Sequence, residues 1–135
     1  MILVVAIDDR MGMLFNHRRQ SQDRLLREAL LQTVGKSRLW VSPYTANQFA
    51  KEQDSRICEE NSFFEKAGAG EYCFLEDPED LTDMSRVEEL IIYRWNRVYP
   101  SDRTLPIDLK NWFLTHTSEF AGHSHEKITK EVYSR

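Results

Sequence analysis

Short apolar runs alternate with polar segments along the whole chain of 135 residues. The first run, residues 2–7 (Ile-Leu-Val-Val-Ala-Ile), is almost continuously apolar, which is typical of a strand buried on both faces of a parallel sheet. We therefore predict that residues 2–7 form a central strand. Similar runs at residues 38–42, 72–75 and 87–93 predict three further strands.

One segment has the clear period of a helix. Apolar side chains recur at helical spacing over residues 25–34, and Gly35 follows as a stop signal. The polar residues before this segment predict its start, with Ser21 as the N-cap and Asp23 as an acid in the first turn.

The remaining patterns are shorter. Thr45 is expected to cap a short helix, and the aromatic pair near residue 64 indicates one or two helical turns. Residues 112–117 and 127–133 predict an antiparallel strand pair around the loop 120–126. Together these elements predict a single α/β domain over residues 1–135, with a mainly parallel central sheet flanked by helices and a C-terminal antiparallel pair.

The composition agrees with one packed domain and favours a cytoplasmic location. Hydrophobic residues make up 41% of the chain, and no window approaches the roughly 18 apolar residues of a membrane span. No basic residue precedes the first apolar run, so a signal peptide is not expected. Cys58 and Cys73 lack Cys-x-x-Cys spacing and favour reduced thiols in the cytoplasm.

Charge is distributed unevenly along the chain. The formal net charge is −4, with +3 in residues 1–50, −7 in residues 51–86 and zero in residues 87–135. The overall sign argues against general nucleic-acid binding. The acidic middle is interpreted as a solvated face, or else as a surface for a basic partner.

The predicted sheet indicates where a ligand would bind, because α/β sheets hold ligands beyond the carboxyl ends of their parallel strands. Polar and aromatic side chains follow all four predicted parallel strands and would gather on one rim. We take nine residues as candidate ligand-binding residues: Asp8, Asn16, Arg18, Arg19, Asp23, Thr45, Arg94, Trp95 and Asn96.

Each main candidate has a functional and a structural interpretation. Arg18 and Arg19 precede a helix N-terminus, so they could hold a phosphate or carboxylate, or could pair with the acidic middle. Asp23 could accept two parallel N–H donors from an amidine-like ring edge, or could simply stabilise the helix start. Trp95 could stack on a heteroaromatic ring while Arg94 and Arg97 hold an anionic tail, or could pack in the core.

No metal site or known nucleophile motif is expected. His123 and His125 have the spacing of two ligands on one strand face, but the sequence supplies no evident third ligand, so exposed, unliganded histidines are an alternative. The motifs Gly-x-Ser-x-Gly, Gly-x-x-x-x-Gly-Lys and Gly-x-Gly-x-x-Gly are all absent.

Several of these segments also match one known family in order along the chain. They are the opening strand with Gly12 and Asn16, Asp23 at the helix start, Thr45, residues 87–93 and 97–99, and the ending 112–135. In this order they resemble a shortened dihydrofolate reductase. The resemblance implies that family's fold, a substrate-binding role for Asp23, the position of a Gly-Arg-x-Thr turn for Thr45, and a helix start at residues 97–99.

The departures from that family fall where its cofactor chemistry takes place. Ser42-Pro43 replaces the Gly-Arg that holds a cofactor phosphate, and residues 94–96 (Arg-Trp-Asn) replace the glycine pair beside the pyrophosphate. The Trp95 side chain would occupy space that a diphosphate needs. Residues 18–20 replace the family's Pro-Trp, and the connection 100–112 is short for the late strands. We therefore do not expect NADPH-dependent reduction, and the sequence names no other cofactor.

Residues 12–24 and 124–133 are also similar to a group of short bacterial proteins, some of which carry a ribonuclease Z label. Ribonuclease Z belongs to the metallo-β-lactamase fold and needs a His-x-His-x-Asp-His run to hold two metals. That run is absent here, so the label is expected to be a misassignment.

Three functions therefore remain open. The first is a protein that binds a small anionic or heteroaromatic ligand, such as a nucleotide or a pterin, at the rim. The second is an enzyme that processes RNA or a nucleotide, with Arg18 and Arg19 on phosphate and Asp8, Asp9 or His125 in acid–base or metal chemistry. The third is a protein whose acidic segment 51–86 docks a basic partner.

Overall fold

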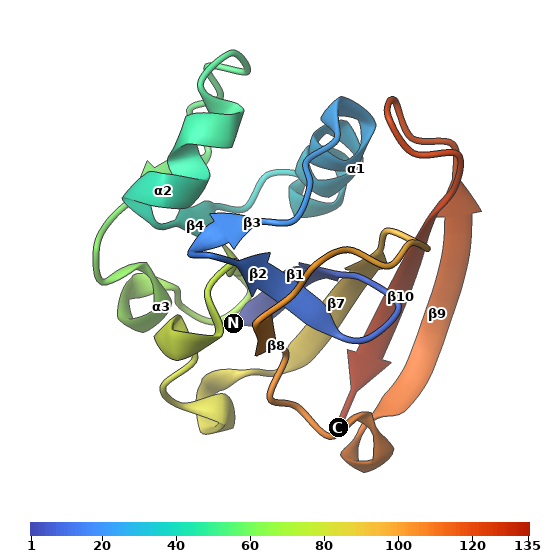
Figure 1. The fold of residues 1–135 in the computed structure, drawn as a ribbon. Helices are drawn as coiled ribbons and strands as arrows, with labels where there is room; N and C mark the ends of the chain where they lie inside the picture. The colour runs from blue at the N-terminus through green and yellow to red at the C-terminus, as the bar shows by residue number, and fades with distance from the viewer.

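A computed structural model describes all 135 residues and contains a seven-stranded sheet (Figure 1). Its strand order is β5-β4-β6-β1-β7-β10-β9. The strands are β1 (Ile2–Ile7), β4 (Leu39–Val41), β5 (Ile57–Glu59), β6 (Tyr72–Phe74), β7 (Glu89–Arg94), β9 (Phe113–Phe120) and β10 (Ile128–Ser134). The first five in this order pair in parallel, whereas β10 and β9 are antiparallel. The predicted mainly parallel sheet and C-terminal antiparallel pair are confirmed.

Helices cover the two faces of the sheet through separate apolar clusters. On one face, α1 (Arg24–Val34) packs Leu26 and Leu30 against Val4 of β1 and Ile91 of β7. On the other face, α3 (Phe63–Lys66) packs Phe63 and Phe64 against the alternate residues of the same strands. The short helices are α2 (Pro43–Ala46), η1 (Asn47–Phe49), η2 (Pro78–Asp80), η3 (Met84–Arg86) and η4 (Leu109–Asn111). Because both faces are covered, β1 and β7 are apolar at almost every position.

A second, three-stranded sheet crosses in front of the main sheet (Figure 1). It consists of β3 (Arg18–Arg19), β2 (Gly12–Phe15) and β8 (Arg103–Thr104), in that order. Asn16 and His17 form the turn between β2 and β3 and both have positive φ, at 56° and 62°. Successive left-handed residues suit the twist of a two-residue hairpin. This second sheet and β5 were not predicted, because their strands are short and their pairing depends on residues far along the chain.

The helix starts differ from the expected ones. Asp23 itself is the N-cap of α1 and accepts a hydrogen bond from the Leu25 N–H at 2.9 Å, so the prediction of Ser21 as the cap was wrong. Ser42, not Thr45, caps α2. Both caps have extended backbone, which turns the side-chain oxygen toward the first free N–H groups of the helix.

No helix starts at residues 97–99, so the helix start expected there was also wrong. Asn96 has φ of 59°, which turns the chain away from helical continuation, and the chain then runs through Pro100 to β8. No helix of the structure is long and apolar enough to cross a membrane.

Part of the acidic middle segment is paired within the protein. Glu52 pairs with Arg27 and Asp54 pairs with Arg56, at 2.7 and 2.5 Å. The Arg56 side chain lowers the pKa of Asp54 to about 2 through hydrogen bonds and charge. These two acids therefore fasten the segment to its own fold and are not available to a basic partner.

Candidate functional site

The carboxyl ends of β1, β4, β6 and β7 lie on one rim of the sheet, as expected from their parallel pairing. Two backbone hydrogen bonds join the loops after β1 and β7: Trp95 N–H donates to Ile7 O at 3.0 Å, and Asp9 N–H donates to Arg97 O at 2.9 Å. The rim is therefore a connected surface on which the candidate side chains form three groups.

Asp8 organises the first group and is fully buried. One carboxylate oxygen accepts the N–H groups of Arg10 and Gly12 at 2.9 and 2.7 Å, and the other accepts Gln20 Nε2 and the Tyr99 N–H, both at 3.1 Å. Burial raises the pKa of Asp8, but these hydrogen bonds outweigh burial and leave the pKa lowered. Asp8 thus holds three loops together, and both its oxygens are already engaged.

Arg19 and Thr45 form the second group around Glu76. The Arg19 guanidinium makes two hydrogen bonds to the Glu76 carboxylate, at 2.9 and 3.0 Å, and lies 4.2 Å above the centre of the Tyr44 ring. Thr45 Oγ1 donates to the same carboxylate at 2.9 Å. A bidentate pair with a carboxylate neutralises Arg19, so this arginine is a structural link between the hairpin and the main sheet.

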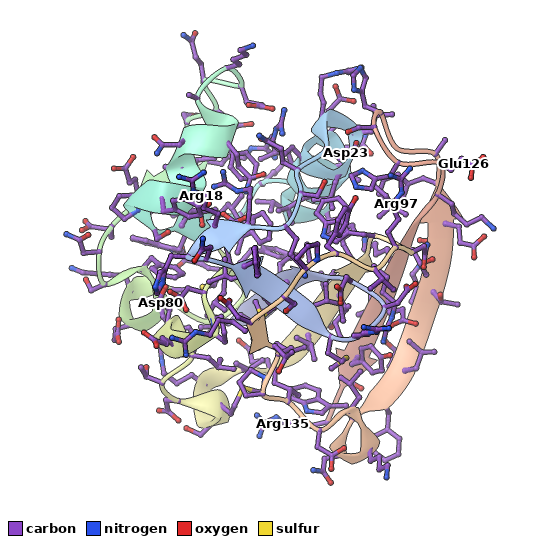
Figure 2. The ribbon with its side chains drawn as sticks, viewed as in Figure 1. Arg18, Asp23, Asp80, Arg97, Glu126 and Arg135 are labelled. Carbon is purple, nitrogen blue, oxygen red and sulfur yellow. The ribbon has the colours of Figure 1, made fainter.

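Asp23 is the centre of the third group and is almost completely buried. Its Oδ1 accepts the N–H groups of Leu25 and His123, both at 2.9 Å. Its Oδ2 accepts the Ser124 N–H and lies 2.9 Å from His125 Nδ1. Figure 2 shows Asp23 at the start of α1, beside the loop between β9 and β10. The donors expected from a ligand ring edge are therefore supplied by the chain itself.

The charge of Asp23 is stabilised by this arrangement. Burial raises its pKa, but hydrogen bonds from His123, His125, Ser124 and Leu25 together hold the pKa of Asp23 well below its usual range. Asp23 is therefore a carboxylate at all ordinary pH values, and it fastens the β9–β10 loop to the N-terminus of α1.

His125 links Asp23 to two hydroxyl groups. Its Nδ1 faces Asp23, while its Nε2 lies 3.0 Å from Ser21 Oγ and 2.9 Å from the Tyr99 hydroxyl. The Trp95 indole stacks on the imidazole with the ring centres 4.4 Å apart and an angle of 24° between the planes. Trp95 is thus a buried packing partner of His125, and no face of its ring is presented to solvent for a ligand.

Gly122 allows the β9–β10 loop to approach Asp23. A Cβ atom at this position would lie 2.8 Å from Asp23 Oδ2, 2.8 Å from the His125 carbonyl oxygen and 3.0 Å from Ile128. We expect Gly122→Ala to lower the unfolding free energy by about 1–3 kcal/mol, because buried groups must move to admit the methyl group. Urea unfolding measures this loss.

The control for Gly122→Ala is Gly68→Ala. Its Cβ would meet only the flexible end of Glu71 at 3.3 Å, so it should change the unfolding free energy by less than about 0.5 kcal/mol. Equal effects of the two substitutions would contradict the close approach at Gly122.

The centre of the rim is closed by these side chains. The cavity between Ser21, Trp95 and Glu76 has a volume of about 10 Å³, which is close to the smallest space that holds a water molecule. A pterin or nucleotide base does not fit there without rearrangement. The open space lies beside this centre, under the β2–β3 hairpin.

That open space, which we call the hairpin hollow, has a volume of about 400 Å³. Its lining consists of Phe15, Asn16, Arg18, Arg19, Gln20, Tyr99 and Pro100. Arg18 projects from β3 at the surface (Figure 2) and takes part in no ion pair, unlike Arg19. The hollow therefore brings three of the nine candidates, Asn16, Arg18 and Arg19, to one place.

Two of the six candidates outside this hollow lie between β7 and β10. Arg94 pairs with Glu131 of β10 at 2.6 Å, and alternation along β7 places it on the opposite face from Trp95. Asn96 donates its side-chain amide to Lys127 O and Thr129 Oγ1, at 3.1 and 2.9 Å. Both residues fasten β10 to the end of β7, so the expectation that they join Trp95 around one ligand was wrong.

His123 and His125 do not share a strand face, because both lie in the loop after β9. His123 is exposed, whereas His125 is buried in the network around Asp23. No group of three or more His, Cys, Asp or Glu side chains in the structure has the arrangement to hold a metal ion. Asp8 and His125, proposed above for metal or acid–base work on nucleotides, belong to separate hydrogen-bonded groups joined through Tyr99.

The positions that the resemblance assigns to a dinucleotide do not fit one. The buried Trp95 indole occupies the position of a glycine, and the Ser42 side chain caps α2. Neither segment contains a glycine, which would let a pyrophosphate come close to the backbone N–H groups.

Comparison with known proteins agrees with the architecture. No family model and no curated protein matches the sequence. Among solved structures, the chain is similar to a dihydrofolate reductase from Enterococcus faecalis complexed with NADP(H) and RAB-propyl. The match has a TM-score of 0.69 and covers 100% of this chain and 96% of that chain, at 10% sequence identity. The fold is dihydrofolate-reductase-like. At this identity the dihydrofolate-reductase-like fold is shared, and the chemistry has to be argued from the residues of this chain.

Four residues at the rim were missed as site residues: Gln20, Ser21, Glu76 and Tyr99. Ser21 was interpreted only as a cap, and His125 as a metal ligand or an acid–base group for nucleotides. The Ser21–His125 contact spans 104 positions in the chain, so no local spacing could have revealed it.

Proposed function

We propose that the protein binds a small anionic ligand with an aromatic ring in the hairpin hollow, and that it does so without NADPH-dependent reduction. The observation that carries this proposal is the free guanidinium of Arg18 beside the rings of Phe15 and Tyr99 in a space of about 400 Å³. Ligand pockets for small molecules have volumes of roughly 300–1,000 Å³.

The charge and the rings have separate roles in this proposal. Arg18 has no acidic partner, so its guanidinium offers two parallel N–H donors to a phosphate or carboxylate. The Phe15 side chain is 46% exposed, which leaves one ring available for stacking. Tyr99 also lines the hollow and is held by its N–H bond to Asp8.

A second hollow, between α1 and the η1 region, is a weaker candidate. It has a volume of about 540 Å³ and contains Arg24, Arg27 and Lys51. Arg24 and Arg27 already pair with Glu28 and Glu52, so less positive charge is left for a ligand there.

The closed centre of the rim argues against NADPH-dependent reduction by this protein. Reduction by NADPH needs the nicotinamide to lie next to the substrate, and the space among Ser21, Trp95 and Glu76 is only about 10 Å³. The proposed ligand therefore binds at the surface hollow rather than beneath it.

The test is calorimetric titration with folate, pterin-6-carboxylate, GMP and NADPH. We expect saturable binding of at least one of the first three, and a loss of about tenfold or more in affinity for Arg18→Ala, since a charged hydrogen bond contributes about 1.5–3 kcal/mol. Arg38→Ala is the control, because Arg38 is exposed at the other end of the sheet and 3.8 Å from its only partner, Glu71. Equal affinities of the Arg18→Ala and wild-type proteins would contradict the proposal, as would silence across the panel.

A further inference from the structure

Ser21, His125 and Asp23 lie in a row at the centre of the rim. Ser21 Oγ is 3.0 Å from His125 Nε2, and His125 Nδ1 is 2.9 Å from Asp23 Oδ2. We propose that these residues form a Ser–His–Asp triad that hydrolyses small carboxylic esters. Such triads are recognised by geometry and roles, and they recur on unrelated folds in different chain orders.

The hydrogen bonds assign a role to each ring nitrogen. The Asp23 carboxylate can only accept, so Nδ1 of His125 carries the proton that it donates to Asp23. The Nε2 lone pair then faces the hydroxyls of Ser21 and Tyr99. His125 is therefore oriented as a base toward Ser21.

The imidazole is held rigidly in this orientation. Trp95 stacks on its face, and Tyr99 packs edge-on with ring centres 6.3 Å apart. Asp23 is fixed by three backbone N–H groups and remains ionised, so it can stabilise the imidazolium that forms when Nε2 takes a proton. Asp23 and Trp95 are thus positioning residues, and Ser21 and His125 are the catalytic pair.

Ser21 is placed where a serine can attack a substrate. It is half-buried, three residues before the first residue of α1, and therefore reachable from solvent. No group of the chain accepts the backbone N–H of Gln22, the residue that follows the nucleophile. That free donor and the positive end of the α1 dipole both favour negative charge at this position.

The reaction balances with water as the only co-reactant. Ser21 Oγ bonds to the acyl carbon and its proton passes to His125 Nε2. The bond from the acyl carbon to the alcohol oxygen breaks, and the alcohol leaves with that proton. Water then attacks the acyl carbon, Nε2 takes a proton from it, and Ser21 Oγ leaves with the proton. The products are a carboxylic acid and an alcohol, with no change of oxidation state.

The surroundings of Ser21 restrict the substrate. The cavity beside it has a volume of about 10 Å³, close to the space of one water molecule, so an ester has to approach Ser21 from its solvent-exposed side. Gln20 and Tyr99 connect Ser21 and His125 to the hairpin hollow, where Arg18 would hold an anionic alcohol part. This preference for an anionic alcohol rests on the proposed function, whereas the reactivity of Ser21 does not.

The test uses p-nitrophenyl acetate, which is uncharged and so does not depend on the hairpin hollow. We expect p-nitrophenol release that Ser21→Ala lowers at least tenfold, and an acetyl group mapped to Ser21 by mass spectrometry of the quenched protein. Ser37→Ala is the matched control with full activity expected, because Ser37 is bonded to Gly70 O at the opposite end of the sheet. Circular dichroism checks that each variant is folded.

Tyr99→Phe distinguishes ester hydrolysis by Ser21 and His125 from non-specific acetylation of surface lysines. It removes the hydroxyl that competes with Ser21 for Nε2, so release should rise several-fold, whereas His125→Gln should abolish it. If Ser21→Ala does not fold, Ser21→Cys keeps an attacking atom, and an acetyl group mapped to residue 21 supports the proposal. Acetylation confined to lysines, or equal release by wild-type and Ser21→Ala proteins, would overturn it. Either result leaves the ligand titration of the hairpin hollow unaffected.

Discussion

Replacement of Asp23 by alanine is expected to lower the unfolding free energy by about 3–5 kcal/mol, because each buried donor left without an acceptor costs about 1–3 kcal/mol. The substitution would leave the N–H groups of Leu25, His123 and Ser124 without their acceptor. It would also remove the N-cap of α1. Denaturant unfolding followed by circular dichroism measures the loss.

Asp23→Ala has a matched control in Asp9→Ala, which removes an exposed carboxylate from the same rim and should cost less than about 0.5 kcal/mol. The pH dependence provides a second check. The pKa of Asp23 is lowered in the folded state, so its contribution is complete above the unfolded value of about 3.9 and is lost as the pH falls toward the folded value. The wild-type protein should therefore lose stability below about pH 4 more steeply than Asp23→Ala. Parallel pH curves for the two proteins would contradict this role.

Replacement of Trp95 by alanine is expected to cost about 3–5 kcal/mol, because it removes a large buried side chain from the centre of the rim. It would also leave one face of His125 without its stacking partner. The vacated space should then accept a free aromatic molecule, as apolar cavities left by truncated side chains do. Indole should therefore raise the melting temperature of Trp95→Ala by several degrees and leave the wild-type protein unchanged.

The control for this experiment is Trp112→Ala. Trp112 is only partly buried and lies under the Arg135 guanidinium, so its removal should cost less and should create no site for indole. Stabilisation of both variants by indole would mean that indole binds elsewhere on the protein. The cavity left by Trp95 would then not explain the stabilisation.

The parts of the fold that sequence could predict are those with long or strongly periodic patterns. Residues 2–7 are buried on both faces of the sheet and therefore form a continuous apolar run. The buried face of α1 appears in the sequence as apolar residues at helical spacing. Strands β2, β3 and β8 have two to four residues each, and their pairing is decided by contacts with residues far along the chain. Propensity within the strand could not reveal those contacts.

The sequence predicted where the candidate site lies, but it did not predict which side chains contact one another there. The rim followed from parallel pairing, and Asp8, Arg19, Asp23, Thr45 and Trp95 do lie there. Their hydrogen-bond partners could not be predicted from the sequence, because many polar residues could pair with them and only the folded chain decides which ones lie within reach. Asp23 was assigned to a ligand edge, and its donors come instead from residues 123–125.

The link between Asp23 and the β9–β10 loop also bears on how the chain folds. Its two sides are separated by about a hundred residues, so the N-cap region of α1 is completed only after the C-terminal hairpin has been made and has docked. Closing so long a loop is entropically costly and slow relative to local helix formation. During synthesis on the ribosome, α1 and the parallel strands would thus exist first with only the local Leu25 N–H bonded to the Asp23 carboxylate. The last hairpin both completes the sheet and commits the chain to its native state.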